Sequence, residues 1–537
     1  MSVMTEAVGE RTLHRTIDWK KTFWIASGVP PLVLFSIGGI AATVGTPSYI
    51  VWTLSILMGF AQSFTYAEIA GMFPNKSGGA PIYGAAAWIH YGKIFGPLSV
   101  WCYWLAWSPV LSIGTGIAAG YVLTGFFPAD SSILTWQWTI ADLGFINQGL
   151  TLRINSTFFL GVVLLLICFA IQHRGILRTA WFQTVVGVVV TVPLLIVAVW
   201  PIITGHVLTS NLTPLVPLGD ANGAGYPFNG HWDKAGWGLF LGGMFIAAWS
   251  TYGFETAVCY TSELTNPGTD TFKAIFFSGI LCLVLFILVP FTFQGALGVK
   301  AMLDPGIYDG SGVAKAMASM FGTAGVIYFV MVILLILALV LSIITAMAGS
   351  SRTLYQSSVD GWLPKYLSYV NVHGAPTRAM WTDLCFNVIL LMMSNYLFVL
   401  AVSNCLYIIF NFINLNSGWL HRIDSGHVRR PWRAPNWLLG LGAVFAFVNM
   451  FFMGAGADIY GTNTLLLGII GAALIVPIWI FRHYIQDRGK WPAKMLTDLG
   501  ITEEMMHVRK AGMLPYLTIA AGALVVAASW YYFWVVT

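Results

Sequence analysis

Apolar segments long enough to cross a lipid bilayer are the feature that most constrains this sequence. A helix needs roughly 20 apolar residues to span the hydrocarbon core, and thirteen segments meet that requirement. Of the 537 residues, 57% are hydrophobic and 9% are charged, whereas about a quarter of the residues in a soluble domain carry charge. We therefore expect an all-α polytopic membrane protein. The segments lie near residues 23–44, 48–71, 97–125, 155–172, 180–204, 236–260, 273–298, 323–349, 378–396, 397–420, 437–456, 463–481 and 512–536.

The distribution of Lys and Arg predicts how these spans are oriented. If the N-terminus is cytoplasmic, the inner segments hold 22 of the 26 basic residues and the outer loops hold the other four. Basic residues concentrate in the short loops on the cytoplasmic side, so this split predicts a cytoplasmic N-terminus in the plasma membrane. The four outer residues are Arg153, Lys234, Lys300 and Lys315.

Several functional classes lack their usual sequence signals. The net charge of +5 is spread between apolar spans, which argues against nucleic-acid binding. The six cysteines fall in apolar segments without metal-ligand spacing, so we expect no cofactor and no metal cluster. Neither a P-loop nor an HExxH or GxSxG motif occurs, which argues against a primary pump and an enzyme.

One carboxylate is expected near the middle of the bundle, two residues after a glycine. Glu255 follows Gly253 within the span at 236–260, and an ionisable residue at membrane depth usually faces a bundle interior or a watery cavity. The first span carries small residues at Ser36–Ile40. Interrupted helices at matching positions of two halves indicate a transporter with inverted repeats and a midplane site.

Three sequence blocks together resemble the amino acid, polyamine and organocation (APC) transporter superfamily. They occur in that family's order and cover about residues 20–485, leaving the thirteenth span unexplained. The blocks are Tyr66–Tyr83, Gly253–Glu255 followed by Ser262–Pro267, and Ala348–Tyr355 followed by Asp360–Lys365.

The resemblance implies a LeuT-like fold with five helices repeated in inverted orientation, additional C-terminal helices, and 12 to 13 transmembrane helices in all. It also implies that substrate binds where helices one and six are unwound. The expected parts are a cytoplasmic segment (1–22), two five-helix repeats (23–204 and 236–420), peripheral helices (437–481), a cytoplasmic connector (482–511) and an additional transmembrane helix (512–537).

In the first span, we expect the backbone N–H groups of Gly38, Gly39 and Ile40 to cradle a substrate carboxylate, because an unwound helix exposes such donors. The alternative is that these small residues only allow close helix packing. The expected substrate-binding residues are Ser36, Gly38, Gly39 and Ile40 of the first span, and Trp249, Ser250, Tyr252, Gly253 and Phe254 of the sixth.

Two residues near the sixth-span interruption have competing interpretations. Trp249 matches an aromatic residue that closes the site in some antiporters of the family, although a Trp in an apolar span also serves in packing. Glu255 could titrate during transport, pair with a cationic substrate, or accept hydrogen bonds that steady the broken helix.

Gating and coupling residues are expected elsewhere in the bundle. We expect Glu68 to act as a gate or cap near the cytoplasmic end of the second span. Glu263 and Arg352 are expected to close the cytoplasmic side, although positive-inside anchoring also explains the Arg. Ser342 and Thr345 are candidate sodium contacts, or they bond their own helix backbone. The coupling ion, proton or sodium, stays open.

These observations predict a secondary transporter that moves amino acids, or closely related amino compounds, across the lipid bilayer by alternating access. One alternative is a transporter of amines, polyamines or quaternary ammonium compounds that need no carboxylate, which the aromatic richness would suit. Another is a nutrient receptor that binds without transporting.

Overall fold

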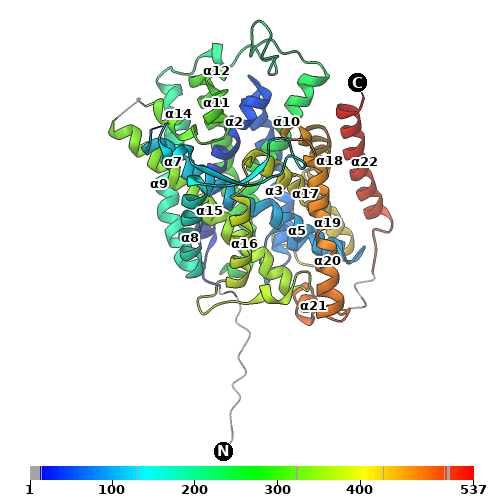
Figure 1. Cartoon of the computed structure of the whole chain (residues 1–537). Coiled ribbons are helices and arrows are strands. Elements are labelled where there is room, and N and C mark those ends of the chain that lie inside the picture. Colours follow the sequence, from blue (N-terminus) through cyan, green and yellow to red (C-terminus); the bar gives the residue numbers. More distant parts are fainter. Residues whose placement is uncertain are drawn as a thin grey trace, which may run out of the picture.

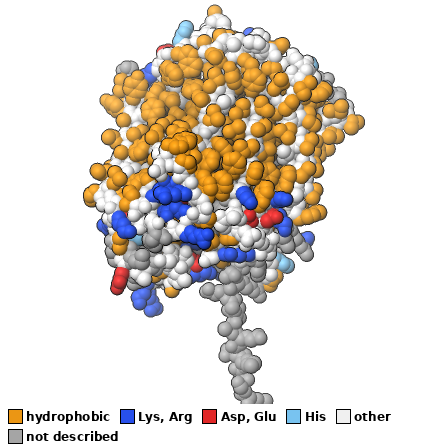
Figure 2. Space-filling model, turned by 180° about the vertical axis from the view of Figure 1, so that it is seen from behind, with side chains coloured by type: hydrophobic (Ala, Val, Ile, Leu, Met, Phe, Trp, Pro, Cys, Tyr) orange, Lys and Arg blue, Asp and Glu red, His pale blue; other side chains and the backbone are white. Residues whose placement is uncertain are grey.

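The computed structural model is helical apart from one small hairpin, which confirms the all-α polytopic class. Among the described residues, eleven helices are long and apolar enough to cross a membrane. Hydrophobic side chains form a broad band on the face shown in Figure 2, and Lys and Arg gather toward one end of it. The description covers residues 13, 15–128, 130–321, 325–426, 428–500, 502, 504 and 508–536, with backbone only at 176–179.

The first half of the chain contains both strands. Its elements are α1 (Trp19–Ala26), η1 (Pro30–Leu32), α2 (Val33–Val44), α3 (Ser48–Gly71), α4 (Ala80–Trp88), α5 (Phe95–Trp107), α6 (Pro109–Phe126), α7 (Ser132–Thr135), β1 (Gln137–Asp142), β2 (Thr151–Asn155), α8 (Ser156–His173), α9 (Ile176–Ile203) and η2 (Thr209–Asn211).

The second half is helical throughout its described elements. These are α10 (Lys234–Thr251), η3 (Gly253–Glu263), α11 (Pro267–Leu297), α12 (Val299–Met302), α13 (Pro305–Tyr308), α14 (Val313–Ser319), α15 (Val326–Val359), η4 (Lys365–Ser368), α16 (Thr377–Leu390), α17 (Tyr396–Asp424), α18 (Asn436–Gly456), η5 (Ala457–Tyr460), α19 (Thr464–Ala473), α20 (Ile475–Ile480), η6 (Phe481–Gln486), α21 (Ala493–Leu499) and α22 (Leu514–Trp534).

Two of the thirteen predicted spans are helical but are not among the eleven long apolar helices. The sixth becomes α10, which ends at Thr251 and continues as the 3-10 helix η3. The ninth becomes α16, which has 14 residues. The interruption predicted in the sixth span is therefore confirmed, while the inverted repeat itself stays a prediction.

The interruption of the first span lies elsewhere than expected. Ser36–Ile40 is regular helix within α2, and the chain leaves α-helical geometry between α1 and α2, at 27–32. Pro30 and Pro31 occupy this break, and proline disfavours a helix interior because it lacks an N–H and its ring clashes with the preceding turn. The expected break at Ser36–Ile40 is thus wrong.

The glycines of α2 serve close packing instead. A Cβ atom placed on Gly38 would lie 1.9 Å from the carbonyl oxygen of Ile307, and one on Gly39 would lie 2.9 Å from Leu397 Cδ2. In addition, their backbone N–H groups belong to a regular helix. The N–H cradle expected from Gly38, Gly39 and Ile40 is therefore absent from α2, and the packing alternative accounts for these glycines.

The two ends of the bundle carry different structures. At the N-terminal end, Ile17 pairs with Leu264 beyond η3. In the half of the molecule that holds α12 and α14, β1 and β2 form an antiparallel hairpin (Figure 1). This hairpin is joined to the turn after α16 through an isolated bridge between Leu152 and Met393.

The additional helix α22 stands at the edge of the bundle against α18 (Figure 1). Close contact is possible because Gly454 of α18 has no side chain; a Cβ there would lie 2.0 Å from the Ser529 Oγ atom. Only 22% of the most apolar stretch of α22 is buried within the protein. The thirteenth span is therefore a peripheral helix.

Candidate functional site

The two helix breaks meet in the centre of the bundle. The Ser36 and Ser250 hydroxyl oxygens lie 2.9 Å apart, and the Ser250 hydroxyl also donates to the Leu32 carbonyl at 3.3 Å. Gly253, the first residue of η3, packs against Trp107 and Leu32. Ser36, Ser250 and Gly253 therefore lie together at this junction with Leu32, and their role in substrate binding stays a prediction.

Side chains of α15 donate hydrogen bonds to backbone carbonyls beside the first break. The Ser342 hydroxyl donates to the Gly28 carbonyl at 2.6 Å, and the Thr345 hydroxyl donates to the Ile25 carbonyl at 2.6 Å. The Gln183 amide donates to Thr345 Oγ1 at 2.9 Å and to the Ile25 carbonyl at 3.2 Å. The hydroxyls thus face the carbonyls freed by the break, and a sodium contact there stays a prediction.

Gln183 itself was not predicted as a functional residue. It is buried in α9, in a segment otherwise dominated by apolar residues. A lone amide in such a segment needs hydrogen-bond partners. That need is the sequence signal that could have marked Gln183 as a functional candidate.

Glu255 is a buried carboxylate surrounded by aromatic donors. Its side chain is 1% exposed. Oε1 accepts hydrogen bonds from Trp107 Nε1 and the Tyr407 hydroxyl, both at 3.2 Å, and Oε2 accepts one from the Tyr103 hydroxyl at 3.1 Å. No Lys, Arg or His among the described residues lies within 4.0 Å of it. The site is therefore anionic and lacks a protein counter-ion when Glu255 is ionised.

The other predicted residues of helix six contact several different helices. Trp249 packs near Phe35, with ring centroids 5.9 Å apart, and donates to the Ala106 carbonyl at 3.0 Å. The Tyr252 hydroxyl donates to Asn449 at 3.0 Å. Trp249 thus contacts α2 and α5, Tyr252 reaches α18, and Phe254 packs toward Phe60 of α3.

Tyr103 and Tyr407 are the contacts of Glu255 that were not predicted. They come from α5 and α17, 152 residues from Glu255 in each direction along the chain. Tyr in an apolar span is usually a packing or interface residue. The sequence therefore offers no local signal that singles them out.

The predicted gating residues Glu68, Glu263 and Arg352 all take part in ion pairs at the N-terminal end of the bundle. Arg352 and Glu263 form two hydrogen bonds of 2.5 and 3.0 Å, both side chains being buried. Lys76 and Asp360 are paired at 2.7 Å and are buried too. These pairs connect η3, the α3–α4 connection and the end of α15.

Glu68 forms ion pairs with two arginines. It pairs with Arg422 at 2.6 Å and with Arg430 at 3.2 Å, and it accepts a hydrogen bond from the Ala434 backbone at 2.8 Å. Glu68 therefore joins α3 to the end of α17 and the segment that follows. None of these partners belongs to a helix break. Its role as a gate or cap stays a prediction.

Two broken helices that meet beside a buried carboxylate, within a bundle of membrane-length helices, are typical of a membrane transporter. Comparison with known proteins supports this class. A sequence model of the amino acid permease family matches residues 17–475, so the chain belongs to that family, and the APC resemblance is confirmed.

Two curated relatives have transport functions. The chain is 22% identical to the polyamine transporter PUT1 of Oryza sativa subsp. japonica over 422 residues, covering 77% of this chain and 67% of the relative. It is 23% identical to the branched-chain amino acid permease BcaP of Lactococcus lactis subsp. cremoris (strain MG1363) over 377 residues, covering 67% of this chain and 72% of the relative. The chain is therefore similar to transporters of two substrate classes.

Proposed function

We propose that this protein moves small organic amines across the membrane by alternating access and binds their ammonium group between the two helix breaks. The observation that carries the proposal is Glu255, a buried carboxylate with no cation within ion-pairing distance among the described residues. An uncompensated charge at this depth is costly. A substrate ammonium would supply the missing positive charge, and Tyr103, Trp107 and Tyr407 would surround it with aromatic rings.

The first helix break also favours amines over carboxylates. Pro30 and Pro31 stand in the break, directly before α2, and neither has a backbone N–H to donate to a carboxylate. The break instead offers carbonyl oxygens, two of which, from Ile25 and Gly28, already accept hydrogen bonds from side chains. Carbonyl oxygens suit an ammonium group.

Amino acids are the second candidate class. The observation that favours them is η3, which begins at Gly253 beside the junction, because the N-terminal end of a helix is its positive end. The similarity to a branched-chain amino acid permease agrees with this class. A carboxylate bound there would, however, lie near Glu255, which is only two residues further along η3.

Alternating access would require the ion pairs at the N-terminal end to open. Arg352 and Glu263 join η3 to α15, and Lys76 and Asp360 join the α3–α4 connection to α15. Both pairs are made in this structure, so the proposed gate is closed on this side.

The test is counterflow of radiolabelled putrescine and L-leucine in proteoliposomes with the purified chain and with Glu255→Gln. We expect the wild type to exchange putrescine faster than leucine. In Glu255→Gln the putrescine flux should be lower by a factor of about ten or more, because a charge-assisted hydrogen bond contributes roughly 1.5–3 kcal/mol. Glu504→Gln is the control, since Glu504 is exposed.

Leucine exchange without putrescine exchange would show that the substrates are amino acids and not amines. Saturable putrescine binding without flux would indicate a receptor. Full putrescine flux through Glu255→Gln would remove Glu255 from substrate recognition.

A further inference from the structure

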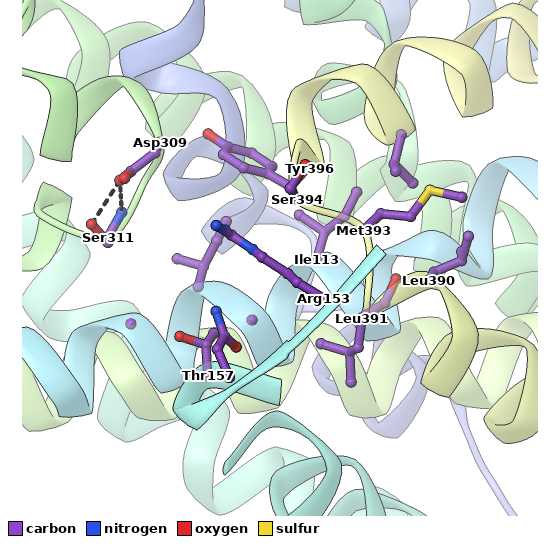
Figure 3. Close-up of a pocket in the computed structure, with 16 residues that line it drawn as sticks. Ile113, Arg153, Thr157, Asp309, Ser311, Leu390, Leu391, Met393, Ser394 and Tyr396 are labelled. Carbon is purple, nitrogen blue, oxygen red and sulfur yellow. Dashed lines mark hydrogen bonds between the residues drawn. The ribbon is translucent and has the colours of Figure 1, made fainter. Parts of the chain in front are cut away.

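A cavity lies away from the helix breaks, in the half of the bundle that carries the β-hairpin. Its volume is about 210 Å³, below the roughly 300–1,000 Å³ typical of drug-sized ligands. Its walls come from α6, β2, the start of α8, the loop between α13 and α14, the turn after α16, and α17 (Figure 3). The size suits a molecule as small as an amino acid.

Hydrogen bonds between distant segments build the walls of this cavity. The Arg153 backbone N–H donates to the Met392 carbonyl at 2.8 Å, and the Thr151 backbone N–H donates to the Ser394 hydroxyl at 2.9 Å. Across the cavity, the Tyr396 hydroxyl donates to the Tyr308 carbonyl at 3.0 Å. The cavity is therefore bounded by fixed segments.

Two opposite charges face this cavity without pairing with each other. The half-buried Arg153 side chain points from β2 toward the side where Asp309 and Tyr396 lie (Figure 3). Among the described residues, its guanidinium donates a single hydrogen bond, to Gln137 Oε1 at 3.3 Å. Asp309 accepts hydrogen bonds from the Ser311 backbone and hydroxyl at 2.9 and 2.6 Å. Within the described residues, neither charge has an ion-pair partner within 4.0 Å.

The rest of the lining is mostly apolar or small. Glycines leave room in α6, because a Cβ on Gly116 would have only one neighbour within 4 Å, Leu391 Cδ2 at 3.7 Å. A cationic donor, an anionic acceptor and an apolar wall together match the carboxylate, ammonium and side chain of an aliphatic α-amino acid. The apolar lining side chains are Ile113, Ile117, Leu390, Leu391, Met393 and Val399.

We propose that this cavity binds a zwitterionic α-amino acid, with its carboxylate on Arg153 and its ammonium on Asp309, at a site separate from the helix breaks. The central site differs in chemistry, since it presents Glu255 without a basic side chain. The cavity is lined by elements of both halves of the chain, α6 and β2 on one side and α17 on the other. A bound amino acid would therefore favour the arrangement of these halves seen here, and would modulate transport without being carried.

The experiment measures equilibrium binding of tritium-labelled L-leucine to the purified full chain in phosphatidylglycerol nanodiscs. This lipid has no ammonium group, whereas the headgroup of phosphatidylethanolamine carries the same pair of charges as an amino acid. We expect saturable binding that persists in Glu255→Gln and weakens about tenfold or more in Arg153→Gln, because the charge-assisted hydrogen bonds to the carboxylate are lost.

Two further variants separate binding from folding. Gly116→Met should also abolish leucine binding, because it fills the cavity without changing a charge, while Gly116→Ala should bind normally. Lys315→Gln is the charge control, since Lys315 is exposed in the same half of the molecule and does not line the cavity. Putrescine counterflow through Arg153→Gln and Gly116→Met should continue, which would show that both variants are folded.

Leucine affinity that is unchanged in both Arg153→Gln and Gly116→Met would overturn the proposal, as would leucine binding lost in Glu255→Gln alone. No leucine binding to a wild type that exchanges putrescine would also overturn it and leave the amine transport proposal intact. Conversely, leucine binding that depends on Arg153, in a chain without putrescine flux, would support this site and reject amine transport.

Discussion

At the scale of single residues, the central site depends on what each group can donate or accept. Glu255 accepts three hydrogen bonds from aromatic side chains and lacks a cationic neighbour within the described part of the chain. Pro30 and Pro31 remove two backbone donors from the adjoining break. Together these residues give the junction an excess of acceptors, which is the chemical basis for proposing an ammonium ligand.

Pro30→Ala and Pro31→Ala should each make the site more tolerant of carboxylates. Either substitution restores a backbone N–H at the first break, so we expect L-leucine to compete with putrescine about tenfold better than in the wild type. The measurement is inhibition of labelled putrescine uptake by leucine. Pro201→Ala, near the end of α9, is the control and should leave the competition unchanged, and an equal gain there would contradict the role of the break.

Residue-level sequence reasoning succeeded where the signal was local and failed where it was not. The expense of a carboxylate in an apolar span marked Glu255 as special without any knowledge of its neighbours. The glycines of α2, by contrast, were interpreted as a break, although glycine equally permits close packing. Only the position of Ile307 against Gly38 distinguishes the two uses.

At the scale of elements, close approaches and ion pairs determine how the helices fit together. Gly38 of α2 lies directly against the Ile307 carbonyl of α13. Arg352 of α15 is bound to Glu263 at the end of η3, with both charges buried. Each contact joins segments that are distant in sequence, so a change at one residue displaces a whole element.

Gly38→Ala should destabilise the protein, because its Cβ would overlap a backbone oxygen that cannot rotate away. We expect a cost of about 1–3 kcal/mol, typical of overpacking in a dense core, measured as a lower thermal unfolding midpoint in detergent. Gly71→Ala is the matched control, since its Cβ would lie 3.4 Å from the nearest atom, in Pro431. Equal midpoints for both variants would show that α2 can shift to make room.

Arg352→Ala should lower the free energy of unfolding considerably more than the loss of an exposed ion pair does. Removing one member of a buried ion pair leaves the other charged and unpaired, at a cost of roughly 3–5 kcal/mol. Lys365→Ala is the comparison, because Lys365 is 56% exposed in its pair with Asp487, and such pairs contribute about 1 kcal/mol or less. Thermal unfolding of both variants provides the measurement, and a midpoint for Arg352→Ala no lower than that for Lys365→Ala would contradict the argument.

At the scale of the whole molecule, α22 is an addition to the bundle. It packs mainly on α18, and most of its apolar surface faces outward. The family match ends at residue 475, before this helix begins. Neither helix break nor the cavity beside the β-hairpin uses a residue from it.

A chain truncated after Lys510 should therefore still fold and exchange substrate. Loss of α22 exposes one face of α18 to lipid, so we expect a lower thermal midpoint with the counterflow of putrescine retained. Size-exclusion chromatography and proteoliposome flux are the measurements. A truncated chain that is monodisperse but inactive would assign α22 a part in transport.

The sequence by itself determined the membrane class, the family and the place of the helix-six break. These follow from hydrophobic length, motif order and one costly carboxylate, which are properties of contiguous residues. Tertiary structure alone decided that Tyr103 and Tyr407 meet at Glu255, that Gln183 bridges Ile25 and Thr345, and that Arg153 shares a cavity with Asp309. The physical reason is that such contacts depend on how helices pack against one another, and no pattern within a single helix specifies which distant side chain will face it.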